Sequence, residues 1–177
     1  LHRSLRRRQL KGRLNALFLH DKMEHTKVIA LVNEALQTND SLFLIEVIVT
    51  ADAKIFVVVD GDQGVTLKEC IRISRYIENN LDREVEDYAL EVMSAGLSEP
   101  LKVRRQYQKN IGKTLTLKLK EGTLVEGILD SIDEDGLNLS WEARETKPLG
   151  KGKITVTKNA KFAFEELKEA KVKIIFN

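Results

Sequence analysis

One stretch decides the fold of the first half of the chain: residues 55–70, with the sequence IFVVVDGDQGVTLKEC. Its first five residues are β-branched or aromatic and predict a strand, which the Asp- and Gly-rich residues 60–64 end. Thr66 lies three residues before Glu69, which is the spacing of a capping box at the start of a helix. Apolar residues then recur at helical spacing, so the sequence predicts a helix over residues 67–81.

The flanking segments complete a small α/β domain. A helical pattern covers about residues 25–37, and residues 42–50 (LFLIEVIVT) predict a strand. The link to the strand at 55–59 is short, which implies an antiparallel hairpin. A third strand is expected at about 88–93, and the crossover through the helix should place it parallel to one of the first two strands. We therefore expect an αββαβ domain, a small mixed sheet with two helices on one face, over residues 23–101.

The second half has the period-two pattern of short strands. Leu115, Leu117 and Leu119 alternate with polar residues, and similar patterns predict five strands, near residues 114–120, 124–132, 137–143, 153–157 and 171–176. Five short strands in about 65 residues are typical of a small, partly open β-barrel of the SH3-like or Sm-like kind. Phe162, Phe164 and Leu167 are expected to close one end of this barrel. The predicted fold class is thus α+β, with the barrel over residues 113–177.

Charge is distributed unevenly along the chain, although the net charge is only +2. Residues 23–101 hold six basic and fifteen acidic residues, a net charge of −9. Residues 102–112 hold four basic residues and no acidic ones, and we interpret them as a basic helical hinge. The barrel segment holds twelve basic and eleven acidic residues. An acidic domain repels phosphate backbones and attracts cationic partners.

Residues 1–22 form a separate basic arm, with seven basic residues and one acidic residue. Three interpretations remain open: a nucleic-acid-binding tail, a targeting peptide, or sequence that precedes a translation start at Met23.

The pattern Gly61-x-x-Gly64 is the clearest local motif. In KH domains such a loop joins two helices and clamps a nucleic-acid backbone, whereas here it joins a strand to a helix, and Asp60 and Asp62 would oppose a phosphate. A tight turn fits better, with the two carboxylates near the positive end of the following helix. The spacing also fails for an EF-hand calcium loop.

The sequence contains no pattern that supports catalysis, a metal or a cofactor. The only cysteine, Cys70, lies in the apolar stripe of the predicted helix and indicates a reducing compartment. His2, His20 and His25 are not spaced as metal ligands, and nucleophile-elbow, P-loop and Rossmann motifs are absent. No apolar run reaches the roughly 18–20 residues of a membrane helix. We therefore expect a non-enzymatic protein without a membrane segment.

Two groups of basic residues are candidate RNA contacts. The first lies on the hinge, where the charged residues point away from Val103 and Tyr107: Lys102, Arg104, Arg105 and Lys109. The second lies on the polar loop of the barrel: Arg144, Lys147, Lys151 and Lys153. Without interleaved exposed aromatic residues, such charge indicates non-specific phosphate binding, and ordinary solvated charge is the alternative.

Two stretches resemble the signature of the RimP-type ribosome maturation factors. The first is residues 57–70, continuing to Ile73-Ser74-Arg75, and the second is residues 88–101, YALEVMSAGLSEPL. The order of parts, an α/β domain before an SH3-like barrel, agrees with the family over about residues 24–177. The chain departs from the usual family residues at four positions, Met93, Ala95, Ser98 and Glu99.

The resemblance implies a cytoplasmic, non-enzymatic factor that binds the immature small ribosomal subunit and helps to install the basic ribosomal protein that lines the decoding centre. It also implies partner-binding residues within the two motifs: Asp60, Gly61, Asp62, Gly64, Ser94, Gly96, Leu97 and Pro100. The acidic domain would then shield the basic protein, while the hinge and the barrel loop would face rRNA. The alternative is a general RNA-binding module that uses the basic hinge and the barrel loop. In either case we expect a monomer.

Overall fold

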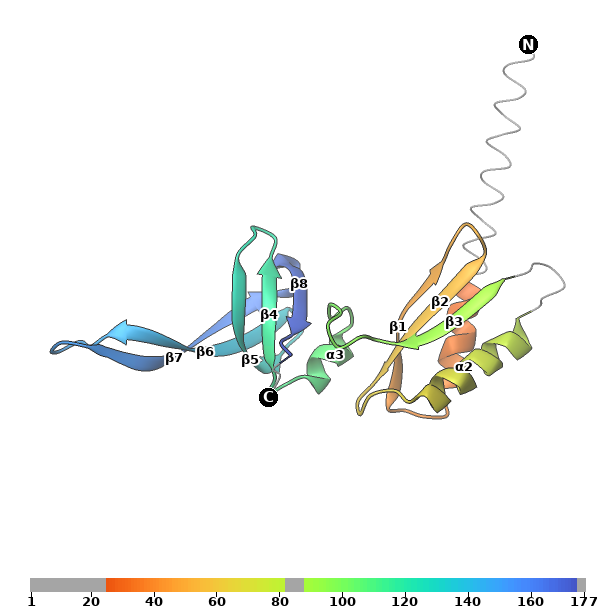
Figure 1. Ribbon diagram of the computed structural model, residues 1–177, viewed down its shortest axis with the longest axis horizontal. Coiled ribbons are helices and arrows are strands. Elements are labelled where there is room, and N and C mark those ends of the chain that lie inside the picture. Colours follow the sequence, from red (N-terminus) through yellow and green to blue (C-terminus); the bar gives the residue numbers. More distant parts are fainter. Residues whose placement is uncertain (1–24, 82–87, 175–177) are drawn as a thin grey trace, which may run out of the picture. The chain divides into compact units, whose positions relative to one another are not determined.

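The computed structural model describes residues 25–81 and 88–174, and the chain divides into two compact units, one up to Ala95 and one from Gly96 (Figure 1). The predicted basic arm lies outside the described residues. None of the helices in the described part of the chain has the length and hydrophobicity needed to cross a lipid bilayer.

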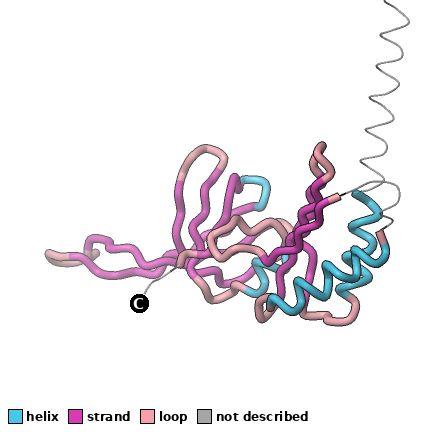
Figure 2. Tube along the Cα trace, turned by 45° about the vertical axis from the view of Figure 1, so that its right-hand side comes forward, coloured by secondary structure: helices cyan, strands magenta, loops and turns pink. Residues whose placement is uncertain are grey.

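The first unit contains the predicted helix, strand, strand, helix, strand order. A first helix is described over residues 25–36, followed by β1 (Leu42–Val49), β2 (Lys54–Gly61), α2 (Leu67–Asn80) and β3 (Ala89–Ser94). The sheet order is β1-β2-β3, with β1 antiparallel and β3 parallel to β2. Both helices lie on the same face of this sheet (Figure 2), which confirms the predicted fold of the domain.

The core of the first unit follows from the two periodicities of its elements. Side chains at helical spacing, such as Val28 and Val32 on the first helix and Ile73 and Ile77 on α2, are fully buried. They pack in one cluster with alternating residues of β2, among them Val57. Burying each side chain of this size contributes roughly 1.5–3 kcal/mol, so this layer holds the helices on the sheet.

The start of α2 is fixed by side-chain hydrogen bonds. The Thr66 hydroxyl accepts a hydrogen bond from the Glu69 backbone N–H at 3.3 Å, which is one half of the predicted capping box. The Glu69 carboxylate accepts a hydrogen bond from Arg72 Nε at 2.8 Å, and Arg72 Nη1 donates to the carbonyl of Ala35 at 2.8 Å. Arg72 therefore ties α2 to the carboxyl end of the first helix, where a cation is favoured.

The second unit begins with a short helix and continues as a five-stranded antiparallel sheet. Its elements are α3 (Arg104–Lys109), β4 (Thr114–Leu119), β5 (Leu124–Ile132), β6 (Gly136–Thr146), β7 (Lys153–Ala163), the 3-10 helix η1 (Phe164–Glu166) and β8 (Leu167–Val172). The strand order is β7-β6-β5-β4-β8. This arrangement is consistent with the expected small barrel-like domain.

Residues 102–112, which we interpreted as a basic helical hinge, contain the short helix α3 and group with the second unit. The division between the units lies at Ala95 and Gly96, and α3 belongs to the second unit. Tyr107 is only 7% exposed and packs in one cluster with the strand residues of that unit. The buried side chains of Gln106 and Asn110 also have local partners: Asn110 Nδ2 donates to the backbone carbonyl of Gln106 at 2.7 Å, and Gln106 Oε1 accepts from the Lys102 N–H at 2.8 Å. Apolar packing outweighs the solvation of the neighbouring charges.

The last three strands differ in their bounds from those predicted. The last described strand, β8, covers Leu167–Val172 and so begins earlier than the predicted strand at 171–176, of which residues 175–176 lie outside the described residues. Ala170 of β8 faces the core opposite Leu117 and is 1% exposed. An alanine between charged residues is a weak sequence signal for a buried strand position, although its small side chain fits a closely packed core. The strands β6 and β7 are also longer than predicted, and they pair from Gly136↔Ala163 to Thr146↔Lys153.

Candidate functional site

The acidic turn after β2 is the first part of the candidate site. The Asp60 carboxylate is buried and accepts a hydrogen bond from the Gly61 N–H at 2.8 Å. Gly61 has no room for a side chain, because a Cβ there would lie 2.4 Å from the Gly64 carbonyl oxygen and 2.8 Å from Leu42 Cδ2. Gly64 has φ +86°, the left-handed region that favours glycine. Asp62 is exposed, so the turn presents one carboxylate to solvent.

The second motif meets this turn at the edge of the sheet. Ser94 pairs with Val59 in the parallel ladder, and the Ala95 N–H donates to the Val59 carbonyl at 2.9 Å. Asp60 and Ser94 therefore lie at the carboxyl ends of neighbouring parallel strands, although they are far apart in sequence. In open α/β sheets this edge is where ligands bind, since the loops that follow the strands converge there.

The other residues of the second motif fall in the second unit. The Glu99 N–H donates to the Gly96 carbonyl at 3.1 Å, which closes a turn, and Leu97 in that turn is 82% exposed. The Leu101 N–H donates to the Ala170 carbonyl at 2.8 Å and so attaches the segment after Pro100 to β8. The structure thus assigns Gly96, Leu97 and Pro100 to a different unit from the acidic turn.

The first group of basic residues lies on and before α3. The side chains of Lys102 and Arg104 are exposed, whereas Arg105 and Lys109 are half-buried. The Gln106 side-chain oxygen fixes the backbone just before α3. It accepts hydrogen bonds from the N–H groups of Lys102, at 2.8 Å, and of Val103, at 3.3 Å. Because these bonds cap the helix, the position of Arg104 is set by backbone geometry.

The second group lies at the end of the β6–β7 hairpin, which extends well beyond the other strands of its unit (Figure 1). Arg144, Lys147, Lys151 and Lys153 are all exposed. The hairpin closes where the Lys147 N–H donates to the Gly152 carbonyl at 3.1 Å, and Gly150 and Gly152 have positive φ. Basic side chains therefore project from a ribbon whose backbone is fixed by strand pairing.

The two basic groups lie at opposite ends of β6. Glu134, just before this strand, lines the same pocket as Arg104, whereas Thr146 at the other end pairs with Lys153. Ten residues of extended chain separate Gly136 from Thr146, and they span about 33 Å. The sequence predicts two groups of basic residues, and the structure adds that they lie at opposite ends of one long strand.

A pocket of about 520 Å³ opens beside the first basic group, within the second unit. Its lining residues come from α3 and the segment before it, from η1, from β8 and from the turn before β6: Pro100, Leu101, Lys102, Arg104, Tyr107, Glu134, Phe164, Leu167, Lys168, Glu169 and Ala170. The rings of Tyr107 and Phe164 meet edge to face, with centroids 5.3 Å apart. Burial raises the pKa of the Tyr107 hydroxyl, which donates a hydrogen bond to the Leu101 carbonyl at 3.3 Å.

Sequence reasoning found parts of this pocket without recognising it as one. The sequence predicts that Phe164 closes one end of the barrel and that Tyr107 lies on the side of residues 102–112 away from the charged residues. Glu134 and Lys168 were not singled out, because single charges in strands and turns carry no pattern. The pairing of Tyr107 with Phe164 depends on how α3 packs on the sheet.

The comparison with known proteins identifies the family. Residues 31–98 match the RimP N-terminal domain. The chain is 50% identical over 150 residues to a protein of Christiangramia forsetii, named ribosome maturation factor RimP, covering 85% of this chain and 97% of that protein. Proteins of the same name from Flavobacterium psychrophilum and Porphyromonas gingivalis are 48% and 36% identical, covering 97% and 99% of their lengths. The chain belongs to the RimP family.

The RimP match includes the first motif and residues 88–98 of the second. It begins within the first helix and ends at Ser98, and so contains the whole sheet of the first unit. The longer alignments with the RimP relatives cover 85% of the chain and so include much of the second unit as well. The resemblance noted in the two motifs is thereby confirmed.

The described part of this chain offers no metal centre. Within residues 25–81 and 88–174, no group of three His, Cys, Asp or Glu side chains could hold a metal ion. The His25 ring nitrogen Nε2 lies 3.0 Å from the Val47 carbonyl, which it can reach with a hydrogen bond. Cys70 is buried in the core, and burial raises the pKa of its thiol. The position of His25 is explained by this hydrogen bond, and that of Cys70 by packing in the core.

Proposed function

We propose that this RimP-family protein binds the immature small ribosomal subunit and assists the incorporation of a basic ribosomal protein near the decoding centre. The relatives are named ribosome maturation factors, and RimP proteins are non-enzymatic assembly factors. The subunit, the basic protein and a cytoplasmic location are the parts of the proposal that go beyond the family. We further propose that the protein acts as a monomer.

The observation that carries the proposal is the separation of charge between the two units. Residues 23–95, up to the boundary between the units, hold fourteen acidic and six basic residues, and the turn after β2 exposes Asp62 at the carboxyl end of that strand. The candidate RNA contacts all lie in the second unit. A basic ribosomal protein is attracted by the first surface and phosphate by the second, so one molecule can bring the two together.

Binding of the full chain to purified small-subunit proteins tests the first part of the proposal. We expect a basic small-subunit protein to bind, with an affinity that falls between about 50 and 200 mM salt because the attraction is screened. Asp62→Asn and Glu91→Gln, which remove exposed charges of the first unit, should slow association. The matched control is Glu165→Gln, an exposed acid of the second unit. An absence of binding at low salt, or equal losses in all three variants, would contradict the proposal.

Co-sedimentation with immature small subunits tests the second part. The full chain should sediment with these particles, and a chain that begins at Met23 should do so equally if the arm is dispensable. If the protein remains in the supernatant at low salt, subunit binding is excluded.

A general RNA-binding module is the second candidate function, and the exposed hairpin of the second unit favours it. In this case Arg104→Ala and Arg105→Ala, or Lys147→Ala and Lys151→Ala in the hairpin, should weaken binding to unrelated RNAs and reduce its salt dependence. RNA binding that depends only on residues 1–22 would exclude this function.

A further inference from the structure

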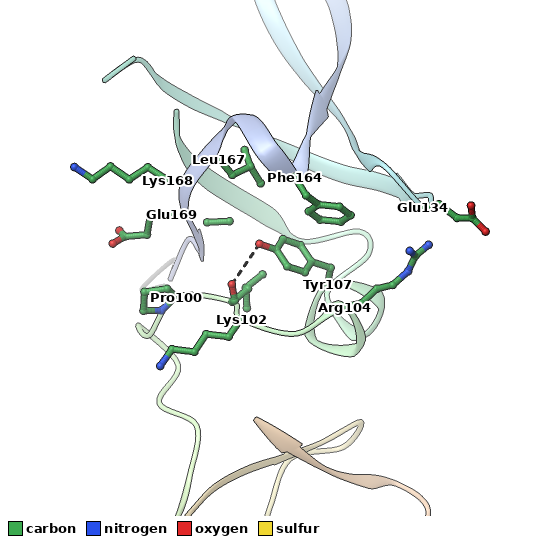
Figure 3. A pocket seen from close by; sticks show the side chains of 11 residues that line it. Pro100, Lys102, Arg104, Tyr107, Glu134, Phe164, Leu167, Lys168 and Glu169 are labelled. Carbon is green, nitrogen blue, oxygen red and sulfur yellow. Dashed lines mark hydrogen bonds between the residues drawn. The ribbon is translucent and has the colours of Figure 1, made fainter. Parts of the chain in front are cut away.

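The pocket of the second unit has an aromatic and apolar floor. The half-buried ring of Phe164 packs edge to face with Tyr107, and Leu101, Leu167 and Ala170 complete the apolar lining (Figure 3). The Tyr107 hydroxyl donates a hydrogen bond to the Leu101 carbonyl at 3.3 Å (Figure 3). The ring pair is therefore held in place before any ligand arrives. A volume of about 520 Å³ lies within the range of small-molecule sites.

Charged side chains surround this floor on two sides. Figure 3 shows Arg104 and Glu134 on one side of the aromatic pair, and Lys168 and Glu169 on the other. Glu169 is paired with Lys171 at 3.1 Å, whereas neither Arg104 nor Lys168 forms an ion pair with another described residue. The rim thus presents two cations that are available to an anion, and Lys102 adds a third positive charge.

We propose that this pocket binds one unpaired nucleobase of an RNA strand, with the adjacent phosphates held by Arg104 and Lys168. The base packs on the exposed part of Phe164, since aromatic side chains stack bases without regard to sequence. Arg104 and Lys168 lie on opposite sides of the floor, so they meet the phosphates before and after the inserted nucleotide. This inference rests on the proposed contact with rRNA and assigns that contact a site.

The mixed charge of the rim favours a nucleotide over an acidic peptide. Glu134 and Glu169 would repel the carboxylates of an acidic segment, whereas the amino group of a base can donate a hydrogen bond to a carboxylate. An acidic peptide also has no large flat group to cover the aromatic floor. The requirement for an unpaired base follows from the stacking on Phe164, because the bases of a duplex are already stacked on one another inside the helix.

Fluorescence anisotropy with labelled oligouridylate and oligoadenylate measures the stacking contribution in the full chain. Phe164→Leu keeps an apolar side chain but removes the π-face, and we expect affinity to fall about tenfold. The matched control is Phe162→Leu, which removes a ring that packs on the same core outside this pocket. Far-ultraviolet circular dichroism verifies that both variants are folded. Equal affinities of Phe164→Leu and Phe162→Leu would overturn the proposal.

The rim cations are tested by salt dependence. Arg104→Gln and Lys168→Gln should each reduce the slope of log affinity against log salt by about 0.7, the value for one phosphate contact on a single strand. Lys118→Gln, on the exposed side of β4, is the matched control and should leave the slope unchanged. No change in slope for either rim variant would also overturn the proposal.

Two further measurements separate the possible failures. Oligoglutamate that competes with the oligonucleotide and is insensitive to Phe164→Leu would indicate an anion site without base recognition, which refutes the proposal. If the full chain still sediments with small subunits while Phe164→Leu loses nothing, the pocket inference fails and the proposed function stands. If the full chain does not sediment with small subunits while Phe164→Leu still weakens oligonucleotide binding, the proposed function fails and the pocket inference stands.

Discussion

Gly61→Ala is expected to destabilise the first unit, because the turn leaves no space for a methyl group. The new Cβ would lie 2.4 Å from the Gly64 carbonyl oxygen, whereas real Cβ atoms essentially never approach closer than 3.0 Å. The Gly64 N–H also donates to the Gly61 carbonyl at 2.9 Å, so the backbone cannot move apart without loss of that hydrogen bond. Overpacking of this kind costs about 1–3 kcal/mol.

Two natural probes report the two units separately. The only cysteine, Cys70, is 8% exposed in the core of the first unit, so it reacts with a thiol reagent when that unit opens. The only tryptophan, Trp141, packs against the core of the second unit. For Gly61→Ala, a loss of about 2 kcal/mol raises the rate of Cys70 labelling roughly 30-fold. It also lowers the melting temperature of that unit by roughly 8–16 °C. The Trp141 transition should not move.

Gly64→Asn is the matched control for this prediction. A Cβ at Gly64 meets no atom within 4 Å, and asparagine tolerates a φ of +86° better than most residues. This variant should therefore label only slightly faster than the parent protein. If Gly61→Ala labels at the parent rate, the turn is free to rearrange and the steric argument is wrong.

Three further predictions concern the second unit. Lys161 lowers the pKa of the Asp133 carboxyl below its ordinary value of 3.8 by a side-chain hydrogen bond, so this stabilisation is present above that pH and is lost as the pH falls through the folded pKa. Lys161→Ala should raise the pKa of Asp133, as measured by NMR titration, and an unchanged pKa would contradict this. Leu129→Ala, at a fully buried position, should cost about 2–5 kcal/mol in urea unfolding followed by tryptophan fluorescence, and a loss below 1 kcal/mol would mean that the core collapses around the cavity. Lys151→Ala and Lys153→Ala should weaken RNA binding without a change in melting temperature, because both side chains are exposed, and a lower melting temperature would show that they support the hairpin.

Much of the first unit could be predicted from local patterns. The strand, turn and helix over residues 55–81 rest on short-range chemistry: β-branched residues, a glycine turn and a threonine cap. The parallel position of β3 follows from the handedness of the crossover. Membership of the RimP family was visible in the two motifs, since both lie in continuous stretches. The roles of their individual residues in partner binding stay predictions.

The second unit shows where sequence reasoning fails. Positive charge at residues 102–112 indicated a solvent-facing hinge, but Tyr107 packs on the barrel core and places α3 there. A single aromatic residue among charges has no periodicity, so its burial cannot be read locally. The same reason explains why the start of β8 was predicted too far along the chain. Its core residue Ala170 is small and lies between charged neighbours.

The sequence by itself determined the order of the elements, the family and the uneven distribution of charge, because each is encoded in neighbouring residues. The tertiary structure alone brought Ser94 beside Asp60, through the pairing of β2 with β3. It alone placed the two basic groups at opposite ends of β6. It alone placed Phe164 against Tyr107 to form a pocket, because burial of apolar surface from distant segments, rather than any local pattern, decides which side chains meet.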